Sequence, residues 1–555
     1  MRNKQRIKQL FAYILIITLF FSVTGCIPEE NGLPAHDDTV DLSEYIDLYP
    51  EEKEAVILSS ALMTTDLNPL KPSGENDVAF YQLLYKNIVD LDENQQCIPS
   101  VALEWNIQED LKTWRFVIAD NIEFSDGSLL TPNDVLFTLE TLKGYGTNSP
   151  YYSAVNNIKS MEVDGNTLVI NLHSEDITLP WKMNIPVLSK KAYESLDQEI
   201  QLTGTGPFKV ESIDETGVTL KKINREKLFY KMQFVSTEKD AMEILKPGNN
   251  SISVVSAREG DLYEQRVDLY KNTYTGSEFV FIAFNGNAQY MNKQNIRNAI
   301  SCFLNVEDMV NQVYGETMVR AEYPVHPDSF LLEWAIGAIH KFDPENGKAL
   351  MKQENVPLYS DVYQKVITVT TTDAEGNTTV SYRYTPLRLR ILVNAYDPQK
   401  MEIAQRLQSE LEGVGIQTVI NAQSSVKVKE LISRKEYDIL VSSVSLSVVP
   451  DPFEMGMLYQ PGDDKMLNVC NLPSKNDLTA LGEKTYKASS LSGMMEGLND
   501  VQMFVKNNVP YIGLGYKKVS CVYSRTITGS FGRDTFSFFR DPETWTADNF
   551  EYTGD

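Results

Sequence analysis

Two serine–lysine pairs have the S-x-x-K spacing at which a lysine can activate a serine hydroxyl as a nucleophile, Ser236–Lys239 and Ser424–Lys427. Acyl enzymes of that type carry companion S-D-N and K-T-G motifs, and this sequence has neither. Motifs of phosphate-binding loops, zinc proteases and α/β-hydrolases are also missing. The histidines stand far apart, at His36, His173, His326 and His340. The sequence therefore predicts no enzyme, no cofactor and no metal site.

Another reactive side chain, the thiol of Cys26, stands where the longest apolar run ends. A basic start is followed by an apolar run from Leu10 to Val23, the pattern of a secretory signal and too short to span a membrane. The segment Val23–Cys26 resembles the bacterial lipobox, which implies cleavage before Cys26 and a lipid on its thiol. We therefore expect an extracytoplasmic protein that is anchored to the cell membrane by lipid. The alternative is an ordinary signal peptide with an incidental cysteine.

Composition narrows the class of partner. The formal net charge is −25 at pH 7, which argues against binding nucleic acid, because phosphates require basic neutralisation. The hydrophobic content of 42% is enough for a packed core, and the length suggests about two to four domains. The other cysteines form no C-x-x-C pair, and buried free thiols are expected, with up to two disulfides as the alternative: Cys97, Cys302, Cys470 and Cys521.

The elements that must position a site follow from the apolar spacing. Five alternating segments of strand and helix type predict a β-α-β-α-β unit, hence a parallel, doubly wound sheet with ligands at the carboxyl ends of its strands. These segments are 387–395, 401–415, 416–422, 427–436 and 437–446.

Shorter patterns place three further elements. Thr131, Pro132 and Asp134 have the order of a helix start, and Gly144 is expected to lie beyond that helix. The apolar spacing between Phe80 and Ile88 predicts another helix. Residues 366–384 alternate on both sides of a Gly-containing turn and predict a hairpin.

The region 99–142 is the most specific in the chain. It resembles the signature of the family 5 solute-binding proteins of ABC importers, the oligopeptide- and dipeptide-binding group. Further similar segments are 204–210, 283–310, 407–420, 436–452 and 507–516. The signature residues are Pro99, Ala102, Trp105, Asp110, Trp114, Phe116, Phe124, Asp126, Gly127, Thr131, Asp134 and Val135.

The resemblance implies an α/β fold of two lobes that close on a ligand about a hinge, a type II periplasmic-binding-protein-like architecture with an extra domain inserted in the first lobe. The implied parts are a lipoprotein signal peptide (1–25), a flexible tether (26–53), the first lobe (54–75, 181–282 and 506–555, the last with the tail), its inserted domain (76–180) and the second lobe (283–505).

The implied function is capture of a substrate, a peptide in the first place, for the permease subunits of an ABC transporter, by a monomer without catalytic residues. The alternatives are a binding protein for an oligosaccharide or another organic solute, and a peptide-sensing receptor lipoprotein. The ligand-binding residues expected from the resemblance are Ser73, Gly74, Glu75, Phe137, Ser443, Val444, Ser445 and Ser447.

The second-lobe segment departs from the oligopeptide pattern. Val444 and Ser447 stand where that group has a Trp and an Asp that pairs with the peptide ammonium. A free N-terminal amine is therefore expected to contribute little to binding, or to pair with another acid such as Glu75. For Phe137, packing within its own helix face is the alternative to lining the cleft.

Overall fold

The structure is a computed structural model, and every residue that it describes lies in the second of two units, 1–53 and 54–555. The predicted signal peptide, Cys26 and the whole of the predicted tether lie outside the described residues. The described residues are 55–59, 67–72, 75–195, 197–214, 217–223, 231–235, 245, 251–330, 340–356, 367–372, 376, 378–383, 387–445, 470, 475–529, 539 and 544–547.

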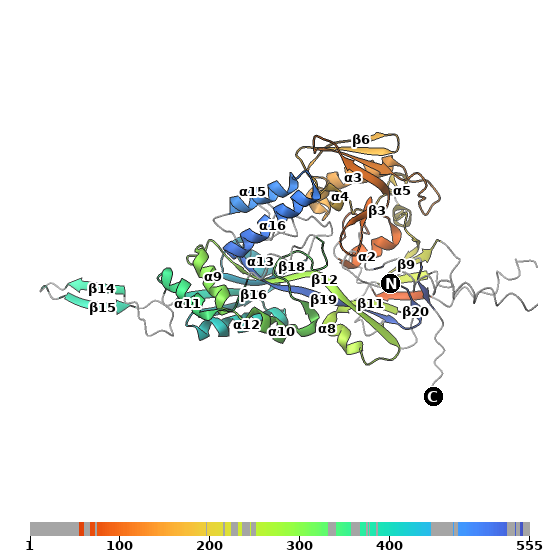
Figure 1. The fold of residues 1–555 in the computed structure, drawn as a ribbon. Helices are drawn as coiled ribbons and strands as arrows, with labels where there is room; N and C mark the ends of the chain where they lie inside the picture. The colour runs from red at the N-terminus through yellow and green to blue at the C-terminus, as the bar shows by residue number, and fades with distance from the viewer. Residues whose placement is uncertain are drawn as a thin grey trace, which may run out of the picture. The chain divides into compact units, whose positions relative to one another are not determined.

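A mixed sheet forms the centre of the fold (Figure 1). Its strand order is β17-β16-β18-β12-β19-β11-β1-β10-β9-β8, and β13 pairs with β19. The strands are β1 (Ala55–Ser59), β8 (Phe208–Asp214), β9 (Gly217–Lys222), β10 (Lys231–Val235), β11 (Ser251–Ser256), β12 (Leu269–Phe284), β13 (Met318–Val319), β16 (Arg388–Asn394), β17 (Gln417–Gln423), β18 (Ile439–Ser445) and β19 (Tyr511–Ser524).

The long antiparallel strands β12 and β19 belong to both halves of this sheet. Their pairing runs from Leu269 opposite Ser524 to Ala283 opposite Tyr511. On one side of this pair, β19 forms an antiparallel pair with β11. On the other side, β12 forms an antiparallel pair with β18. We call the half with β1 and β8–β11 the first lobe and the half with β16–β18 the second lobe, so β12 and β19 are the crossing strands.

The predicted β-α-β-α-β unit is confirmed in the second lobe. β16 pairs in parallel with β17 and with β18. The helices between these strands are α12 (Pro398–Gly413) and α13 (Ser425–Ser433). The other second-lobe helices are α9 (Gln294–Phe303), α10 (Val306–Val313), α11 (Pro344–Gln353), α15 (Lys475–Tyr486) and α16 (Leu491–Asn508).

The segment predicted as an inserted domain contains an antiparallel sheet of order β4-β5-β7-β6 with helix α3 (Pro132–Tyr145) packed against it. We call this sheet, α3 and the loop that follows β7 as far as Lys182 the inserted domain. The predicted start of α3 is confirmed, because the Asp134 carboxylate accepts the Thr131 backbone N–H at 2.9 Å. The end is two residues later than expected: Gly144 lies inside the helix, and Gly146, at φ +56°, is the cap. The strands are β4 (Ala102–Ile107), β5 (Thr113–Ile118), β6 (Ile158–Asp164) and β7 (Thr167–Leu172).

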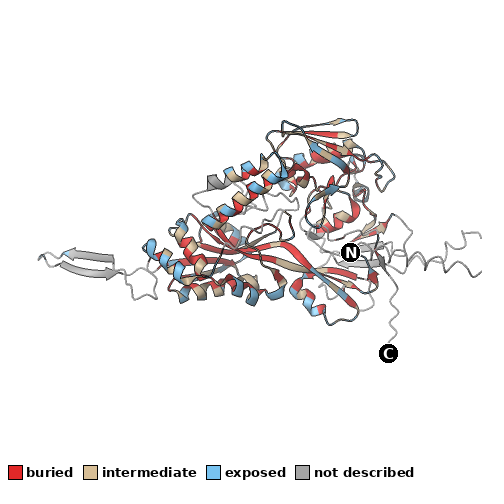
Figure 2. Cartoon of the chain, in the orientation of Figure 1, coloured by how far each residue is buried: buried red, intermediate tan, exposed pale blue. Residues whose placement is uncertain are grey.

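The buried side chains, coloured red in Figure 2, fall into separate hydrophobic clusters. A single cluster joins the inserted domain to the first lobe, for example Phe116 and Leu139 with Phe208 and Ile252. Two further clusters cover the two faces of the second-lobe sheet. Because side chains alternate along a strand, Val280 packs on one face and Phe279 on the other.

Two other expectations have different outcomes. The hairpin predicted at 366–384 is confirmed as β14 (Ile367–Thr372) and β15 (Thr378–Arg383). The helix predicted between Phe80 and Ile88 is wrong at its end. Helix α2 (Glu75–Leu84) stops early, and Ile88 is buried just before strand β2 (Val89–Leu91), where its backbone N–H donates to the Ile185 carbonyl at 2.9 Å and not to a helix carbonyl.

Three properties of the described residues bear on partners. Four cysteines are free thiols, and two of them, Cys470 and Cys521, are buried. No group of three or more acidic, histidine or cysteine side chains in the described segments is placed to hold a metal ion. Within the same segments, no helix has the length and the apolar character that crossing a membrane requires.

Candidate functional site

The carboxyl ends of the parallel strands in the second lobe meet the middle of the crossing strands. Ser445 ends β18 and lies opposite Glu278 of β12. Just beyond β16, Asp397 caps helix α12, and its carboxylate accepts the backbone N–H of Lys400 at 3.0 Å. Ligands of parallel α/β sheets bind outside this edge, so the geometry marks these residues as a candidate site.

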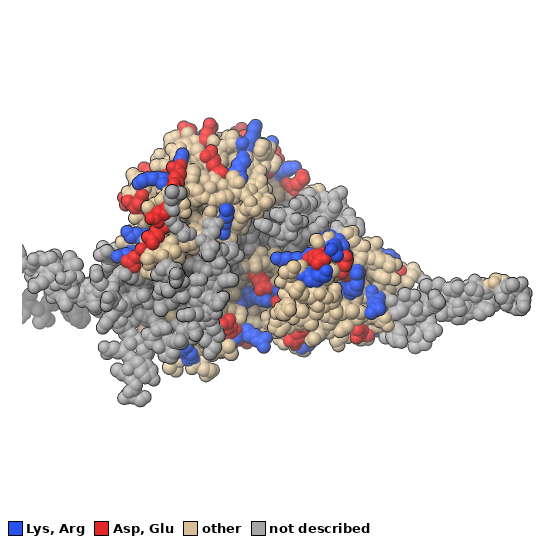
Figure 3. Space-filling view, turned by 180° about the vertical axis from the view of Figure 1, so that it is seen from behind, with Lys and Arg blue, Asp and Glu red and all other residues tan. Residues whose placement is uncertain are grey.

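Four charged side chains meet there, and we call Glu278, Asp397, Lys400 and Lys517 the hinge charge cluster. The Lys400 ammonium lies 3.0 Å from a Glu278 oxygen and 2.8 Å from an Asp397 oxygen. Lys517 lies 3.2 Å from the other Glu278 oxygen. Two carboxylates and two ammonium groups balance, so the cluster has no spare formal charge. Figure 3 likewise shows acidic and basic side chains intermixed over the face in view.

The environment holds the cluster in its charged form. Burial alone would raise the pKa of Glu278, but Lys400, Lys517 and a hydrogen bond with Ser443 hold it below its ordinary value. The pKa of Asp397 is also lowered, because Lys400 and Lys517 outweigh burial. For Lys400, burial opposes the charge, and its two carboxylate partners raise the pKa. All three groups are therefore ionised at neutral pH.

The cluster stands where the crossing strands lose their regular pairing. The register shifts between Thr275 and Phe279, beside Lys517 on the opposite strand. A Cβ on Gly276 would lie 2.8 Å from the Lys517 carbonyl oxygen. Gly515, at φ +150°, is packed so closely that a Cβ would lie 2.2 Å from the Val319 oxygen. These irregularities make the middle of the crossing strands the candidate hinge between the lobes.

Tyr314, after helix α10, lies beside the hinge charge cluster. Tyr314 is buried, and its hydroxyl has no hydrogen-bond partner among the described residues. Burial raises the pKa of Tyr314 most, and the negative charges of Asp397, Glu278 and Glu402 add to that effect. The hydroxyl is therefore a neutral hydrogen-bonding group that is available at this site.

The other face of the crossing strands is aromatic. The ring of Phe279 lies 5.1 Å from that of Tyr516 and 6.3 Å from that of Tyr511. The His326 ring lies nearby, tilted by 58° to the Tyr516 ring with the ring centres 5.5 Å apart. Within the described part of the chain, the hydroxyls of Tyr511 and Tyr516 and the side-chain amide of Gln502 have no hydrogen-bond partner although they are buried. Such groups are costly to bury unpaired, so this aromatic face is a second place where a ligand could bind.

The structure separates the residues that the sequence grouped on β18. Ser443 and Ser445 share the face of Glu278, because Ser443 lies opposite Val280 and Ser445 opposite Glu278. Val444 points to the other face, where it packs against the aromatic cluster. The ring of Phe137 lies edge-on to Tyr193 at 5.6 Å and is partly buried against the core of its own domain.

The remaining predicted positions are less informative. Ser73, Gly74 and Ser447 lie outside the described residues. Glu75 is the first residue of α2, and its side chain lies outside the described part. All eight assignments stay predictions.

Sequence reasoning missed the hinge charge cluster. One signal was present: Glu278 is the lone charge at the start of the apolar run 279–284. A second was Asp397-Pro398, a helix start directly after a predicted strand. Pairing these with Lys517 needs the antiparallel register of β12 and β19, which joins positions more than 200 residues apart.

The comparisons with known proteins define the class. The sequence model of the bacterial extracellular solute-binding proteins, family 5, matches residues 96–466. The chain belongs to this family, and it is a solute-binding protein.

Individual relatives are distant. The chain is 23% identical to the dipeptide-binding protein DppE of Bacillus subtilis over 400 residues, which cover 63% of this chain and 70% of DppE. It is 22% identical to the periplasmic murein peptide-binding protein MppA of Escherichia coli over 300 residues, which cover 48% and 55%.

The fold is shared with solved structures. The structure of NikA from Brucella suis in complex with Fe(III)-EDTA aligns with a TM-score of 0.72 at 15% identity, over 89% of this chain and all of NikA. The expected fold class, α/β with two lobes of the periplasmic-binding-protein type, is confirmed.

Proposed function

We propose that this protein captures a peptide outside the cytoplasm and delivers it to the permease subunits of an ABC importer. The observation that carries the proposal is the placement of hydrogen-bonding groups on both faces of the crossing strands, at the hinge of a solute-binding fold. Family membership supports capture rather than turnover. The names of DppE and MppA support a peptide as the solute.

The chemistry of the site fits a peptide held mainly through its backbone. Serine and tyrosine hydroxyls and the Gln502 amide can pair with peptide N–H and C=O groups. The hinge charge cluster is neutral as a whole, so it offers no unpaired carboxylate to a ligand ammonium. A free amine therefore adds little unless another acid, such as Glu75, reaches it.

Mass spectrometry of ligand released from the purified protein tests the proposal. We expect a fragment series of amino-acid residues, and no consumption of that peptide on prolonged incubation with the protein. An oligosaccharide or another organic solute as the released compound would contradict the peptide assignment. Steady hydrolysis of the peptide, lost on a single side-chain change, would contradict a binding function.

We further propose that a lipid on Cys26 holds the protein to the cell membrane as a monomer. The support is the charge–apolar–small order that precedes Cys26. The substitution Cys26→Ala should move the protein from the membrane fraction to the soluble fraction, with an unchanged melting temperature. Retention of this variant in the membrane after a high-salt wash would contradict the anchor.

A further inference from the structure

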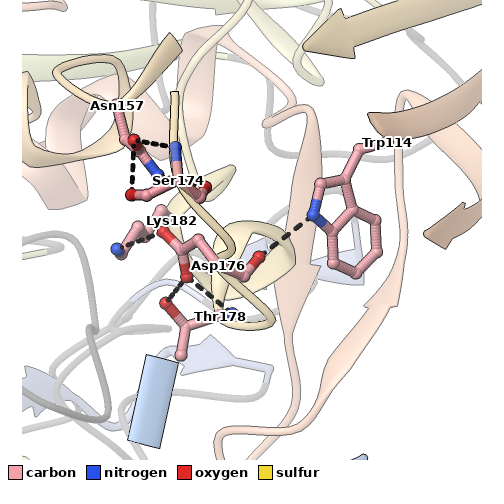
Figure 4. Close-up of polar contacts among 6 residues, drawn as sticks. All are labelled: Trp114, Asn157, Ser174, Asp176, Thr178 and Lys182. Carbon is pink, nitrogen blue, oxygen red and sulfur yellow. Dashed lines mark hydrogen bonds and ion pairs between the residues drawn. The ribbon is translucent and has the colours of Figure 1, made fainter. Parts of the chain in front are cut away.

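One loop of the inserted domain is organised around a buried carboxylate (Figure 4). The side chain of Asp176 accepts the N–H and the hydroxyl of Thr178, at 2.8 and 2.6 Å, and the Lys182 ammonium at 2.8 Å. The indole N–H of Trp114 donates to the Asp176 carbonyl at 3.0 Å. Each of these residues is at most 5% exposed. The loop is therefore fixed by its own domain.

The outer side of this loop contacts the second lobe. The backbone N–H of Ile177 donates to the carbonyl of Tyr486, the last residue of α15, at 3.1 Å. The Lys182 ammonium lies 4.5 Å from the centre of the Tyr486 ring. Ile177 and Trp181 also pack against Met494 and Leu498 of α16. The stretch between Asp176 and Lys182 thus presents a hydrogen bond, a cation and apolar groups to one helix pair.

That helix pair is attached to the other lobe. At its far end, the Arg297 guanidinium of α9 donates to the carbonyls of Asn508 and Val509 at 2.6–3.1 Å. Helices α15 and α16 pack closely, because a Cβ on Gly497 would lie 2.5 Å from the Thr485 hydroxyl oxygen. Helices α15 and α16 are therefore packed against each other and held to the second lobe through α9.

We propose that the contact between the Asp176–Lys182 loop and Tyr486 is a latch that holds the two lobes closed and opens without unfolding either of them. The inserted domain shares the core of the first lobe, whereas α16 shares a core with the second. The crossing strands join the two lobes covalently, and their irregular middle is where rotation is proposed.

Phe330 adds to the same contact, because its ring stacks on Trp181 at 6.0 Å and its N–H donates to the Asn94 carbonyl at 3.3 Å. Separation at this contact breaks two backbone hydrogen bonds, from Ile177 to Tyr486 and from Phe330 to Asn94, and uncovers the small apolar cluster around Met494 and Leu498. The ion pair of Asp176 with Lys182 is kept, because both residues lie on the same side of the contact.

Hydrogen exchange at single amides tests the latch on the full-length protein without added ligand. In the wild type, we expect the Ile177 amide to exchange at least tenfold faster than the amides of Phe281 and Ile512, because a partial opening releases it. The substitution Tyr486→Ala should speed Ile177 exchange by a further tenfold or more. The amides of Phe281 and Ile512 should keep their rates.

Matched variants separate the latch from general stability. Tyr486→Phe keeps the ring over Lys182 and should exchange like the wild type. Lys487→Ala removes only the exposed pair with Glu483 and should also leave Ile177 unchanged. Small-angle scattering should show a larger radius of gyration for Tyr486→Ala than for both controls.

Two results would overturn the proposal. One is wild-type exchange of Ile177 at the rate of the Phe281 amide, which would show that the contact opens only when the protein unfolds. The wild-type measurement gives this answer even if Tyr486→Ala does not fold. The other is unchanged Ile177 exchange in a folded Tyr486→Ala protein. Neither result depends on the identity of the ligand.

Discussion

Two clusters of charge in this protein use the same residue types and differ in what can reach them. In the inserted domain, the Asp176 and Lys182 side chains are 4% and 6% exposed. In the hinge charge cluster, the exposed fraction rises from 12% for Lys400 to 33% for Glu278. The Asp176 carboxylate accepts hydrogen bonds from Thr178 and Lys182, which lie in the same domain. The hinge charge cluster lies at the carboxyl ends of the parallel strands, where a ligand can approach it. Burial and saturation thus distinguish a structural ion pair from charges that a ligand can approach.

The largest expected change in stability comes from the buried ion pair of Asp176 with Lys182. Asp176→Asn leaves the Lys182 ammonium buried without a carboxylate, which should cost about 3–5 kcal/mol in the free energy of unfolding. Chemical denaturation measures this. Asp164→Asn is the control in the same domain, because its pair with Arg115 is exposed and should be worth less than about 1 kcal/mol. Equal losses in the two variants would contradict the distinction drawn from burial.

A smaller effect is expected in the hinge backbone itself. Gly515→Ala places a Cβ against the Val319 carbonyl at a φ that side chains rarely adopt, and should cost about 2 kcal/mol or more. Gly413→Ala in α12 is the matched control, since open space surrounds that Cβ, and it should stabilise by about 0.5–1 kcal/mol. Thermal unfolding compares the two. A Gly515→Ala protein as stable as the wild type would show that the crossing strands have more room than the structure gives them.

The smallest change in stability should come from the hinge charge cluster, and it should depend on pH. Glu278→Gln should cost about 1 kcal/mol at pH 7, because the pair is partly exposed. The folded-state pKa of Glu278 is lowered, so its contribution is present above the ordinary glutamate pKa and is lost as pH falls through the folded value. Unfolding free energies of the wild type and the variant should therefore converge as the pH falls below the ordinary glutamate pKa and through the lowered folded value. A difference that grows on acidification would mean that Glu278 is destabilised in its charged form.

The sequence predicted local structure better than the site. The β16–α12–β17–α13–β18 unit and the start of α3 follow from apolar spacing and capping residues, which act over a few positions. Family resemblance predicted the two-lobed fold through the segment 99–142. The hinge charge cluster and the Tyr486 contact join residues that are distant in sequence, and no local pattern specifies such pairings. The sequence reasoning named Ser443 and Val444 together, and strand alternation places their side chains on opposite faces of the sheet.

The central claim is that a peptide is held at the hinge without a dedicated partner for its ammonium group. The most direct measurement is calorimetric binding of the peptide released from the purified protein, with its amine free and with its amine acetylated. We predict dissociation constants within about tenfold of each other. Weakening by 100-fold or more on acetylation, about 2.7 kcal/mol, in the wild type would contradict the claim. If Glu278→Gln abolishes that loss, Glu278 holds the amine, and if the loss persists, an acid outside the hinge charge cluster holds it.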